Sequence, residues 1–212
     1  MNTTEIEAIL RERISSWQLQ PGTKLRELPL ATEFGVDRAK IRSAFIALER
    51  RGLIDRVPNQ GAVVKTFTAS DYMQLYDVFE MLEGLCARLA AQNAPAGAWT
   101  HLIDLFGDEL EAAVKNNDCE SLFNAILEYR ASTIAAANNP TLTGFLESIY
   151  EKTQFIIKRT LILPGRAAQS FQEHKEIIRA LAARDPVRAE ELKRENMKSA
   201  RLTLEKYISF VF

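Results

Sequence analysis

Apolar residues recur at helical spacing early in the chain, and turn residues divide them into short segments. From residue 3 to 17 they fall three or four positions apart, which predicts a helix capped by Thr3 or Thr4. A Pro-Gly turn follows, then a very short strand over 24–26. A proline suited to a first helical turn precedes a second helix over 30–34, which a glycine ends.

The next segment, residues 36–52, predicts an amphipathic helix. Arg38 and Arg42 lie four apart on the polar face, in the N-terminal half, and Asp37 can cap the first turn. This is where a recognition helix places its contacts in a major groove, although an ordinary surface helix has the same pattern. The face opposite the arginines carries Ile41, Ala44, Phe45 and Leu48.

Two short apolar runs follow this helix. Residues 53–57 and 61–65 read as strands joined by a polar turn over 58–61. Two helices joined by a tight turn with glycine, followed by a hairpin, predict a winged helix-turn-helix over residues 1–66.

The rest of the chain carries helical periodicity and no strand pattern. Six helices are predicted, each ended by Asn-, Gly- or Pro-rich turns, and helices of this length imply a bundle. The fold class is therefore mainly α, with an all-α second domain over residues 69–212. The predicted helices span 69–92, 97–116, 119–137, 140–161, 168–183 and 186–210.

Composition and charge agree with a two-domain globular protein. The chain has 47% hydrophobic and 26% charged residues. Residues 1–66 carry 11 Lys/Arg against 8 Asp/Glu, a net +3, and residues 67–212 carry 16 against 20, a net −4. No membrane-length apolar run and no basic signal start occur, and Cys86 and Cys119 have no metal spacing, so we expect reduced cysteines and a cytoplasmic location.

Residues 4–66 resemble the DNA-binding domain of the GntR family of bacterial transcriptional regulators. The resemblance implies that Arg38 and Arg42 contact DNA, through guanine or phosphate, and that Gly61 lets the wing backbone approach the minor groove. A larger residue at Gly61 would then impair binding while leaving the fold intact. The matching motifs are Pro21-Gly22-x-x-Leu25-Arg26-Glu27, Phe34-Gly35-Val36-x-Arg38, Arg42-x-Ala44, Gly52-Leu53-Ile54 and Val57-Pro58-Asn59-x-Gly61-Ala62-x-Val64.

Three positions depart from the family pattern. Asp37 stands where Ser or Thr is usual, Leu28 where many members have arginine, and Lys40 where proline is common. The changed cations suggest an operator that differs from the family's usual sequence. The full set of candidate DNA contacts is Arg26, Arg38, Lys40, Arg42, Asn59, Gln60 and Gly61.

The helical half resembles, more loosely, the effector domain of the FadR-like branch, known as the FCD type. Many members bind a divalent metal there, but Ile126, Arg130 and Asn196 occupy three of the four ligand positions and only His174 remains. One imidazole is too few ligands for a protein-held metal. We therefore expect no metal and no other cofactor.

Helical spacing turns Arg130, His174 and Asn196 toward the bundle core. A core guanidinium needs either a buried carboxylate or an anionic ligand. One interpretation is that the three residues line a cavity for a small organic anion. The other is that His174 and Asn196 make ordinary hydrogen bonds in the core.

Catalysis has little support, because His101 and His174 are the only histidines and no phosphate loop or nucleophile motif occurs. The sequence favours a homodimeric transcription factor that binds a pseudo-palindromic double-stranded DNA operator and responds to a small, anionic organic effector. The alternatives are a DNA-binding scaffold without an effector and, less favoured, a helical enzyme fused to a DNA anchor.

Overall fold

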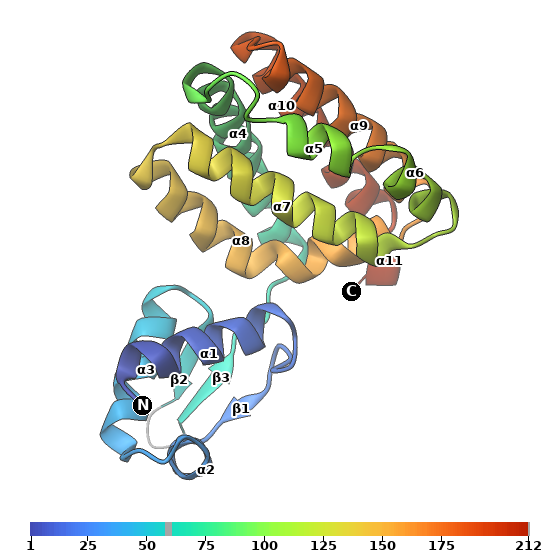
Figure 1. Cartoon of the computed structure of the whole chain (residues 1–212). Coiled ribbons are helices and arrows are strands. Elements are labelled where there is room, and N and C mark those ends of the chain that lie inside the picture. Colours follow the sequence, from blue (N-terminus) through green and yellow to red (C-terminus); the bar gives the residue numbers. More distant parts are fainter. Residues whose placement is uncertain (58–60, 212) are drawn as a thin grey trace. The chain divides into compact units, whose positions relative to one another are not determined.

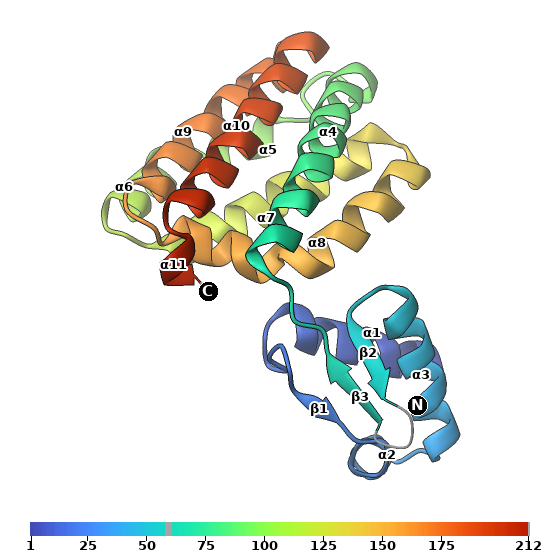
Figure 2. The same ribbon diagram turned by 180° about the vertical axis from the view of Figure 1, so that it is seen from behind.

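The computed structural model describes residues 1–57 and 61–211, and the chain divides into two compact units (Figures 1 and 2). The first comprises Met1–Ser70 with Tyr150–Phe155, and the second Asp71–Ile149 with Ile156–Phe212. The first holds three helices and a small sheet, and the second is helical throughout its described part. The predicted mainly α class with a winged helix-turn-helix at the N-terminus is confirmed.

The three helices of the first unit are α1 (Thr3–Ser15), α2 (Glu27–Phe34) and α3 (Arg38–Arg50). The predicted cap of the first helix is wrong. Asn2, rather than a threonine, accepts a hydrogen bond from the backbone N–H of Glu5, whose side chain accepts one from the backbone N–H of Asn2. This reciprocal pair satisfies two donors at the helix start.

Helix α3 has the predicted two-faced character. The side chain of Asp37 accepts from the backbone N–H of Lys40 at 2.8 Å and caps the helix. Gly35, with φ of +63°, ends α2 in the left-handed region and makes the tight turn into α3. The buried face of α3 joins residues of α1, α2 and the sheet in one apolar core, through Ile41, Ala44, Phe45 and Leu48.

The wing is an antiparallel sheet of β1 (Lys24–Leu25), β2 (Ile54–Val57) and β3 (Gly61–Val64), in the order β1-β3-β2. Leu25 pairs with Ala62, and Val57 pairs with Gly61. The central strand turns Ala62 and Val64 into the core. Asn59 and Gln60, two of the candidate contacts, lie outside the described residues.

The second unit is a bundle in which α9 and α10 lie side by side and α5, α6 and α7 pack against α9. Its apolar core draws on most of these helices and includes Trp99, Phe106, Phe123, Tyr129 and Phe171. The described helices are α4 (Ala69–Asn93), α5 (Thr100–Leu105), α6 (Asp108–Lys115), α7 (Cys119–Ala137), α8 (Pro140–Leu161), α9 (Arg166–Ala182), α10 (Pro186–Lys206) and α11 (Ile208–Val211).

Two predicted helices are each divided in the structure. The predicted helix over 97–116 breaks at Phe106 and Gly107, because Gly107 adopts an extended conformation and begins α6. The predicted helix over 186–210 ends at Lys206 and is followed by the short α11. The remaining four predicted helices are confirmed to within two residues.

Helix α4 contacts α10 closely at Gly84. A Cβ added there would lie 2.6 Å from Cγ of Arg194, so the glycine lets the arginine stem cross the helix surface. The Arg194 Nε then donates to Glu80 at 2.9 Å, and Arg88 pairs with Glu190 at 3.1 Å. The two helices are therefore joined by ion pairs on either side of a small residue.

The expectation that a larger residue at Gly61 leaves the fold intact is wrong. Gly61 has φ of +95°, and a Cβ there would lie 2.2 Å from the carbonyl oxygen of Leu25, within the β1–β3 pairing. We expect Gly61→Ala to destabilise the wing by more than the roughly 1–2 kcal/mol of a left-handed non-glycine residue. The measurement is the urea midpoint by far-UV circular dichroism.

The matched control is Gly22→Ala. Gly22 also has a positive φ, of +81°, but no described atom lies within 4 Å of an added Cβ. Its loss of stability reports backbone conformation alone. Equal midpoints for the two variants would show that the contact with Leu25 does not matter.

Candidate nucleic-acid interface and buried polar cluster

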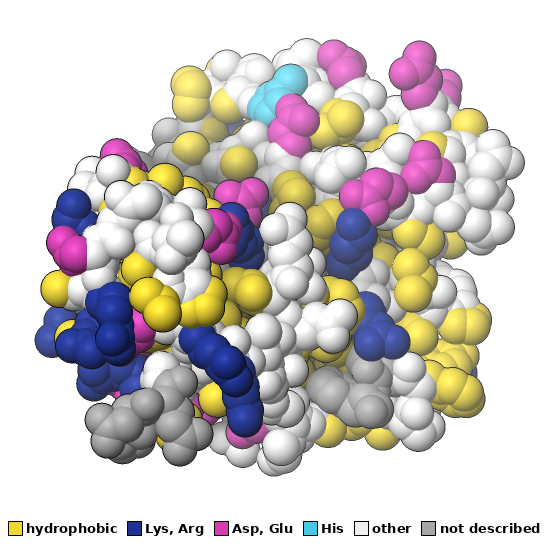
Figure 3. Space-filling view, turned by 90° about the horizontal axis from the view of Figure 1, so that it is seen from below, with side chains coloured by type: hydrophobic (Ala, Val, Ile, Leu, Met, Phe, Trp, Pro, Cys, Tyr) yellow, Lys and Arg dark blue, Asp and Glu magenta, His cyan; other side chains and the backbone are white. Residues whose placement is uncertain are grey.

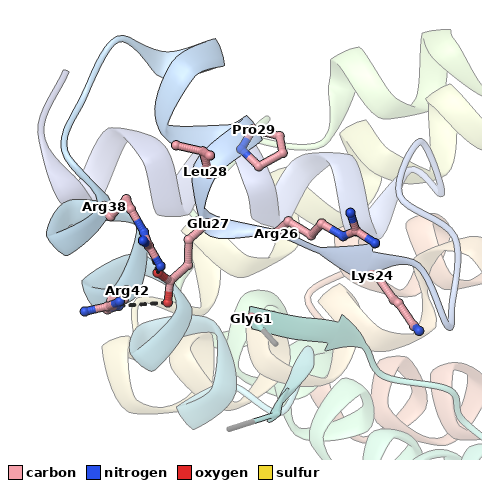
Figure 4. A pocket seen from close by; sticks show the side chains of 8 residues that line it. All are labelled: Lys24, Arg26, Glu27, Leu28, Pro29, Arg38, Arg42 and Gly61. Carbon is pink, nitrogen blue, oxygen red and sulfur yellow. Dashed lines mark hydrogen bonds and ion pairs between the residues drawn. The ribbon is translucent and has the colours of Figure 1, made fainter. Parts of the chain in front are cut away.

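A polar groove of about 780 Å³ lies on the first unit, between the start of α2, the start of α3 and the sheet (Figure 4). In the space-filling view, Lys and Arg side chains gather over this unit (Figure 3). The groove therefore combines concave shape with positive charge, the two features that a DNA backbone and groove require. Its lining residues are Lys24, Arg26, Glu27, Leu28, Pro29, Arg38, Arg42 and Gly61.

One carboxylate holds both recognition-helix arginines. Nε and Nη2 of Arg38 donate to Oε2 of Glu27 at 3.0 and 2.7 Å. Nε of Arg42 donates to Oε1 of the same carboxylate at 2.8 Å. The hydrogen bond from Arg42 is the main cause that lowers the pKa of Glu27, and Glu27 in turn raises the pKa of Arg42. Both shifts favour the charged forms of Glu27 and Arg42.

The predicted contacts fall into two places. Arg26, Arg38, Arg42 and Gly61 come together in the groove. Lys40 instead borders a neighbouring hollow and is exposed, with its ammonium 3.5 Å from the backbone oxygen of Met1. Lys40 thus lies outside the groove.

Sequence reasoning missed Glu27 and Lys24 as groove residues. Glu27 was visible only as part of a family motif, because nothing in the spacing of 27, 38 and 42 shows that three side chains of two helices meet. Leu28 is 64% exposed, and beside Pro29 it forms the apolar part of the groove lining.

A second set of charged residues lies in the core of the helical unit. Glu83 of α4 accepts from Nη1 of Arg130 on α7 at 3.1 Å and lies 3.3 Å from Nζ of Lys193 on α10. Nη2 of Arg130 also donates to the backbone oxygen of Leu146 at 3.2 Å. These three charged side chains are each about nine-tenths buried. The core guanidinium therefore has a protein carboxylate as its partner.

Asn196 joins this set to another ion pair. Its Nδ2 donates to Glu173 Oε2 at 2.6 Å, and its Oδ1 accepts from Lys193 Nζ at 3.2 Å. Glu173 also accepts from Arg166 Nη1 at 2.8 Å. Asn196 thus makes a hydrogen bond between α10 and α9, of the kind that the second interpretation expects.

His174 lies between the aromatic rings of Phe106 and Tyr129, with ring-centroid distances of 5.8 and 5.0 Å. Its Nδ1 is 2.8 Å from the backbone oxygen of Ser170, so this nitrogen carries the proton. Nε2 then has a lone pair and finds no partner among the described residues. Burial, helped by the nearby Lys193 charge, holds the pKa of His174 well below its usual value, so the ring is neutral.

This environment does not fit a divalent metal ion. Among the buried side chains that the structure describes, His174 Nε2 alone has no hydrogen-bond partner, and the charges of Lys193 and Arg166 help to lower the pKa of His174. Within residues 1–57 and 61–211, no three His, Cys, Asp or Glu side chains converge in a way that could hold a metal. The expectation of a metal-free protein stays a prediction.

Together, these features define a class of protein. A winged helix-turn-helix with a cationic groove at its recognition helix, followed by a helical domain with a polar core, is the architecture of a DNA-binding regulator with an attached sensory domain. In the described part of the chain, no helix is both long and apolar enough to cross a membrane.

Comparisons with known proteins agree with this class. Residues 2–64 match the bacterial regulatory proteins of the gntR family, and residues 74–199 match the FCD domain. The chain therefore belongs to the GntR family of bacterial regulators and carries an FCD domain. It is a transcriptional regulator rather than an enzyme.

Individual relatives are distant. The HTH-type transcriptional regulator YdhC of Bacillus subtilis is 26% identical over 91% of this chain and 81% of its own length. The galactonate operon transcriptional repressor of Escherichia coli is 24% identical over 89% and 90%. The structure of McbR/YncC from E. coli superposes with a TM-score of 0.77 at 20% identity, covering 97% of this chain and 98% of that one, which shows a shared fold.

The neutral His174 predicts a loss of stability in acid. Its pKa is depressed in the folded state, so below about 6.5, the ordinary value, the unfolded chain binds a proton that the folded chain does not. Proton binding by the unfolded chain has no effect well above that pH, and it reduces the free energy of unfolding as the pH falls. We expect His174→Gln to lose less stability between pH 7.5 and 5 than the wild type.

The measurement is the urea midpoint from Trp99 fluorescence in a Trp17→Phe background, because Trp99 is buried in the helical unit. The matched control is His101→Gln, at the exposed histidine that pairs with Ser132. Parallel pH profiles for His174→Gln and the wild type would contradict the prediction.

Proposed function

We propose that this regulator binds a pseudo-palindromic operator as a homodimer and that a small organic anion in the helical core changes its affinity for DNA. Its site of action would then be the cytoplasm, where bacterial DNA lies. The observation that carries the DNA part is the groove at the start of α3, where Arg38 and Arg42 lie side by side.

Each chain would read one half-site. The N-terminal half of α3 carries both arginines, and a guanidinium can bind guanine O6 and N7 with two hydrogen bonds. Lys40 and Arg26 are exposed cations beside them, suited to phosphates that fix the register. A dimer would repeat this set about one helical turn away, which is why we propose a two-fold symmetric operator.

Helix α4 supports self-association. Val78 is 53% exposed, and Met81 is 51% exposed. Leu82, Leu85 and Leu89 continue the same face and are half-buried. The helix also has a fully buried face, so it is apolar on two sides, and we propose that the outer side contacts a second copy.

The charge of the core supports an anionic effector. Arg130, Lys193 and Arg166 are three buried cations, whereas Glu83 and Glu173 supply two carboxylates. With His174 neutral, the cluster has an excess of one positive charge, which an anion would balance.

His174 adds a second requirement. The lone pair on Nε2 needs a donor, so the effector would present a hydroxyl or N–H group beside its anionic group. A hydroxycarboxylate meets both requirements. One relative is named for a galactonate operon, and galactonate belongs to this chemical class.

The cluster also suggests how binding is transmitted. Glu83, Arg130 and Lys193 join α4, α7 and α10, so an anion that competes with Glu83 for a cation changes how these helices are tied. Helix α4 is the next element after β3, the last strand of the wing, in the chain. An effector that prefers one of two helix packings would then change operator affinity by its difference in affinity for them.

A scaffold without an effector is the second candidate, and one observation favours it. The ion pairs of Arg130 and Arg166 are already formed with protein carboxylates, so these cations are satisfied without a ligand. The two candidates differ in whether any anion alters DNA binding.

The operator experiment tests the DNA part. Wild-type protein is used to enrich binding sites from random double-stranded DNA, and sedimentation of the complex gives the number of chains per site. We expect an inverted repeat bound by two chains. Arg42→Ala should cost about 1–3 kcal/mol at the operator and relax one base position, because it removes a base contact.

Lys40→Ala is the contrasting variant, because an exposed phosphate contact weakens all sequences alike and reduces the slope of log affinity against log salt by about one. If the Arg42→Ala protein binds the enriched operator at the same protein concentrations as the wild type, α3 is not the recognition helix. One chain per site would contradict the dimer.

The effector experiment titrates galactonate, and then a panel of hydroxycarboxylates and unsubstituted carboxylates, into the protein–operator complex. We expect a hydroxycarboxylate to change operator affinity about fivefold or more, the usual range of allosteric coupling. Arg130→Ala should abolish this change while binding without effector persists. Arg188→Ala, at an exposed arginine of α10, is the control.

The titration is repeated after chelator treatment, and elemental analysis of the purified protein should find less than one metal ion per chain. A full equivalent of bound metal would contradict the metal-free site. The absence of any response across the panel would favour the scaffold.

A further inference from the structure

The position of Glu27 is unexpected for a DNA-binding surface. A carboxylate lines the cationic groove, at the start of α2, and its side chain is only 16% exposed. A negative charge there repels the DNA phosphates, which the cations of the groove attract. Glu27 must therefore contribute something to the groove that offsets this repulsion of DNA.

The hydrogen bonds indicate that role. Each carboxylate oxygen of Glu27 accepts from a different arginine, Oε2 from Arg38 and Oε1 from Arg42 (Figure 4). In each guanidinium, Nε donates to Glu27, so the edge of the side chain that faces Glu27 is held in place. A guanidinium has five N–H donors. Nη1 of Arg38 and both Nη groups of Arg42 make no hydrogen bond to the described residues and keep their donors for DNA.

We propose that Glu27 is a positioning residue that sets the sequence specificity of the proposed DNA binding. It orients the two arginines so that the outer donors of each can bind one base edge with two hydrogen bonds. The inference rests on the proposed operator binding and adds the residue that separates specific from non-specific contacts.

The first part of the mechanism is preorganisation. Arg38 and Arg42 lie one turn apart on α3, and two like charges at this spacing repel each other. Long side chains also lose rotamer freedom when they bind. Glu27 offsets the repulsion and fixes both side chains before DNA arrives, so less ordering is left for the binding step.

The second part is discrimination between acceptors. Guanine O6 and N7 are neutral acceptors, whereas a phosphate oxygen is anionic. A carboxylate bonded to both guanidiniums penalises a phosphate at the same place more than it penalises a base edge. Glu27 therefore lowers affinity for DNA in general and preserves affinity for the matching sequence, which is specificity through a repulsive element.

The test compares Glu27→Gln with wild-type full-length protein on the enriched operator and on a random duplex of equal length. We expect random-duplex affinity to rise, and its slope against log salt to steepen by about one, because one negative charge is removed. The ratio of operator to random affinity should fall about tenfold, on the scale of one well-formed base contact.

Glu33→Gln is the matched control. Glu33 lies on the same helix and pairs with Arg13 at 2.6 Å, but it does not line the groove. We expect its affinity ratio to equal that of the wild type.

Glu27→Asp distinguishes the effect of the negative charge from the effect of side-chain length. It also tests the inference if Glu27→Gln does not fold. It keeps the negative charge but is one methylene shorter, so it cannot hold both arginines as Glu27 does. We expect its affinity ratio to fall while the salt slope stays at the wild-type value.

One result would overturn the inference alone: a ratio of operator to random affinity in Glu27→Gln equal to that of the wild type, whether both affinities stay the same or both rise by the same factor. Wild-type protein that enriches no sequence would instead overturn the proposed operator binding, and with it this inference. The two failures are thus distinguishable.

Discussion

The helical domain depends on the pairing of charge that has been removed from water. Glu83 is buried among apolar helices, and an unpaired carboxylate there would cost several kcal/mol. Arg130 and Lys193 supply its partners from two other helices, so the three helices must keep one arrangement for the charges to meet. Apolar packing alone tolerates small shifts and repacking, whereas this set of ion pairs requires specific positions.

The same arrangement, one carboxylate shared by two donors, recurs with different consequences. Glu27 has it at the surface of the DNA-binding domain, with two arginines that remain more than half exposed. Glu173 has it between Arg166 and Asn196, where the arginine is almost completely buried. Burial decides the outcome: in the core the pairing fixes the fold, and at the surface it leaves donors available to another molecule.

Much of the fold could be predicted from the sequence because its signals are local. The cap at Asp37, the apolar period of α3 and the turn at Gly35 all lie within a few residues of the structure they determine. The break at Gly107 was missed because a single glycine inside a helical period is usually tolerated. The exposed apolar side of α4 at Val78 could not be predicted either, because periodicity shows that a helix has an apolar face, but not whether it has two.

The candidate sites could be predicted only in part, for a physical reason. Helical spacing correctly placed Arg130, His174 and Asn196 in the core, because direction along one helix follows from its period. Their partners come from other helices, and no rule of spacing connects Arg130 with Glu83 across 47 positions of the chain. For the same reason, the contacts of Glu27 with Arg38 and Arg42 could not be predicted. The clash between a Cβ at position 61 and Leu25 could be predicted only from the strand register.

The exposed Leu28 gives the groove a property that its charges do not. Beside Pro29 it forms apolar surface at the place where nucleic acid would lie, and in water this surface is hydrated. Covering it would release that water, with a negative heat-capacity change that ionic strength does not screen. Part of the hold on DNA would therefore persist when salt has weakened the electrostatic part, and it would weaken on cooling instead.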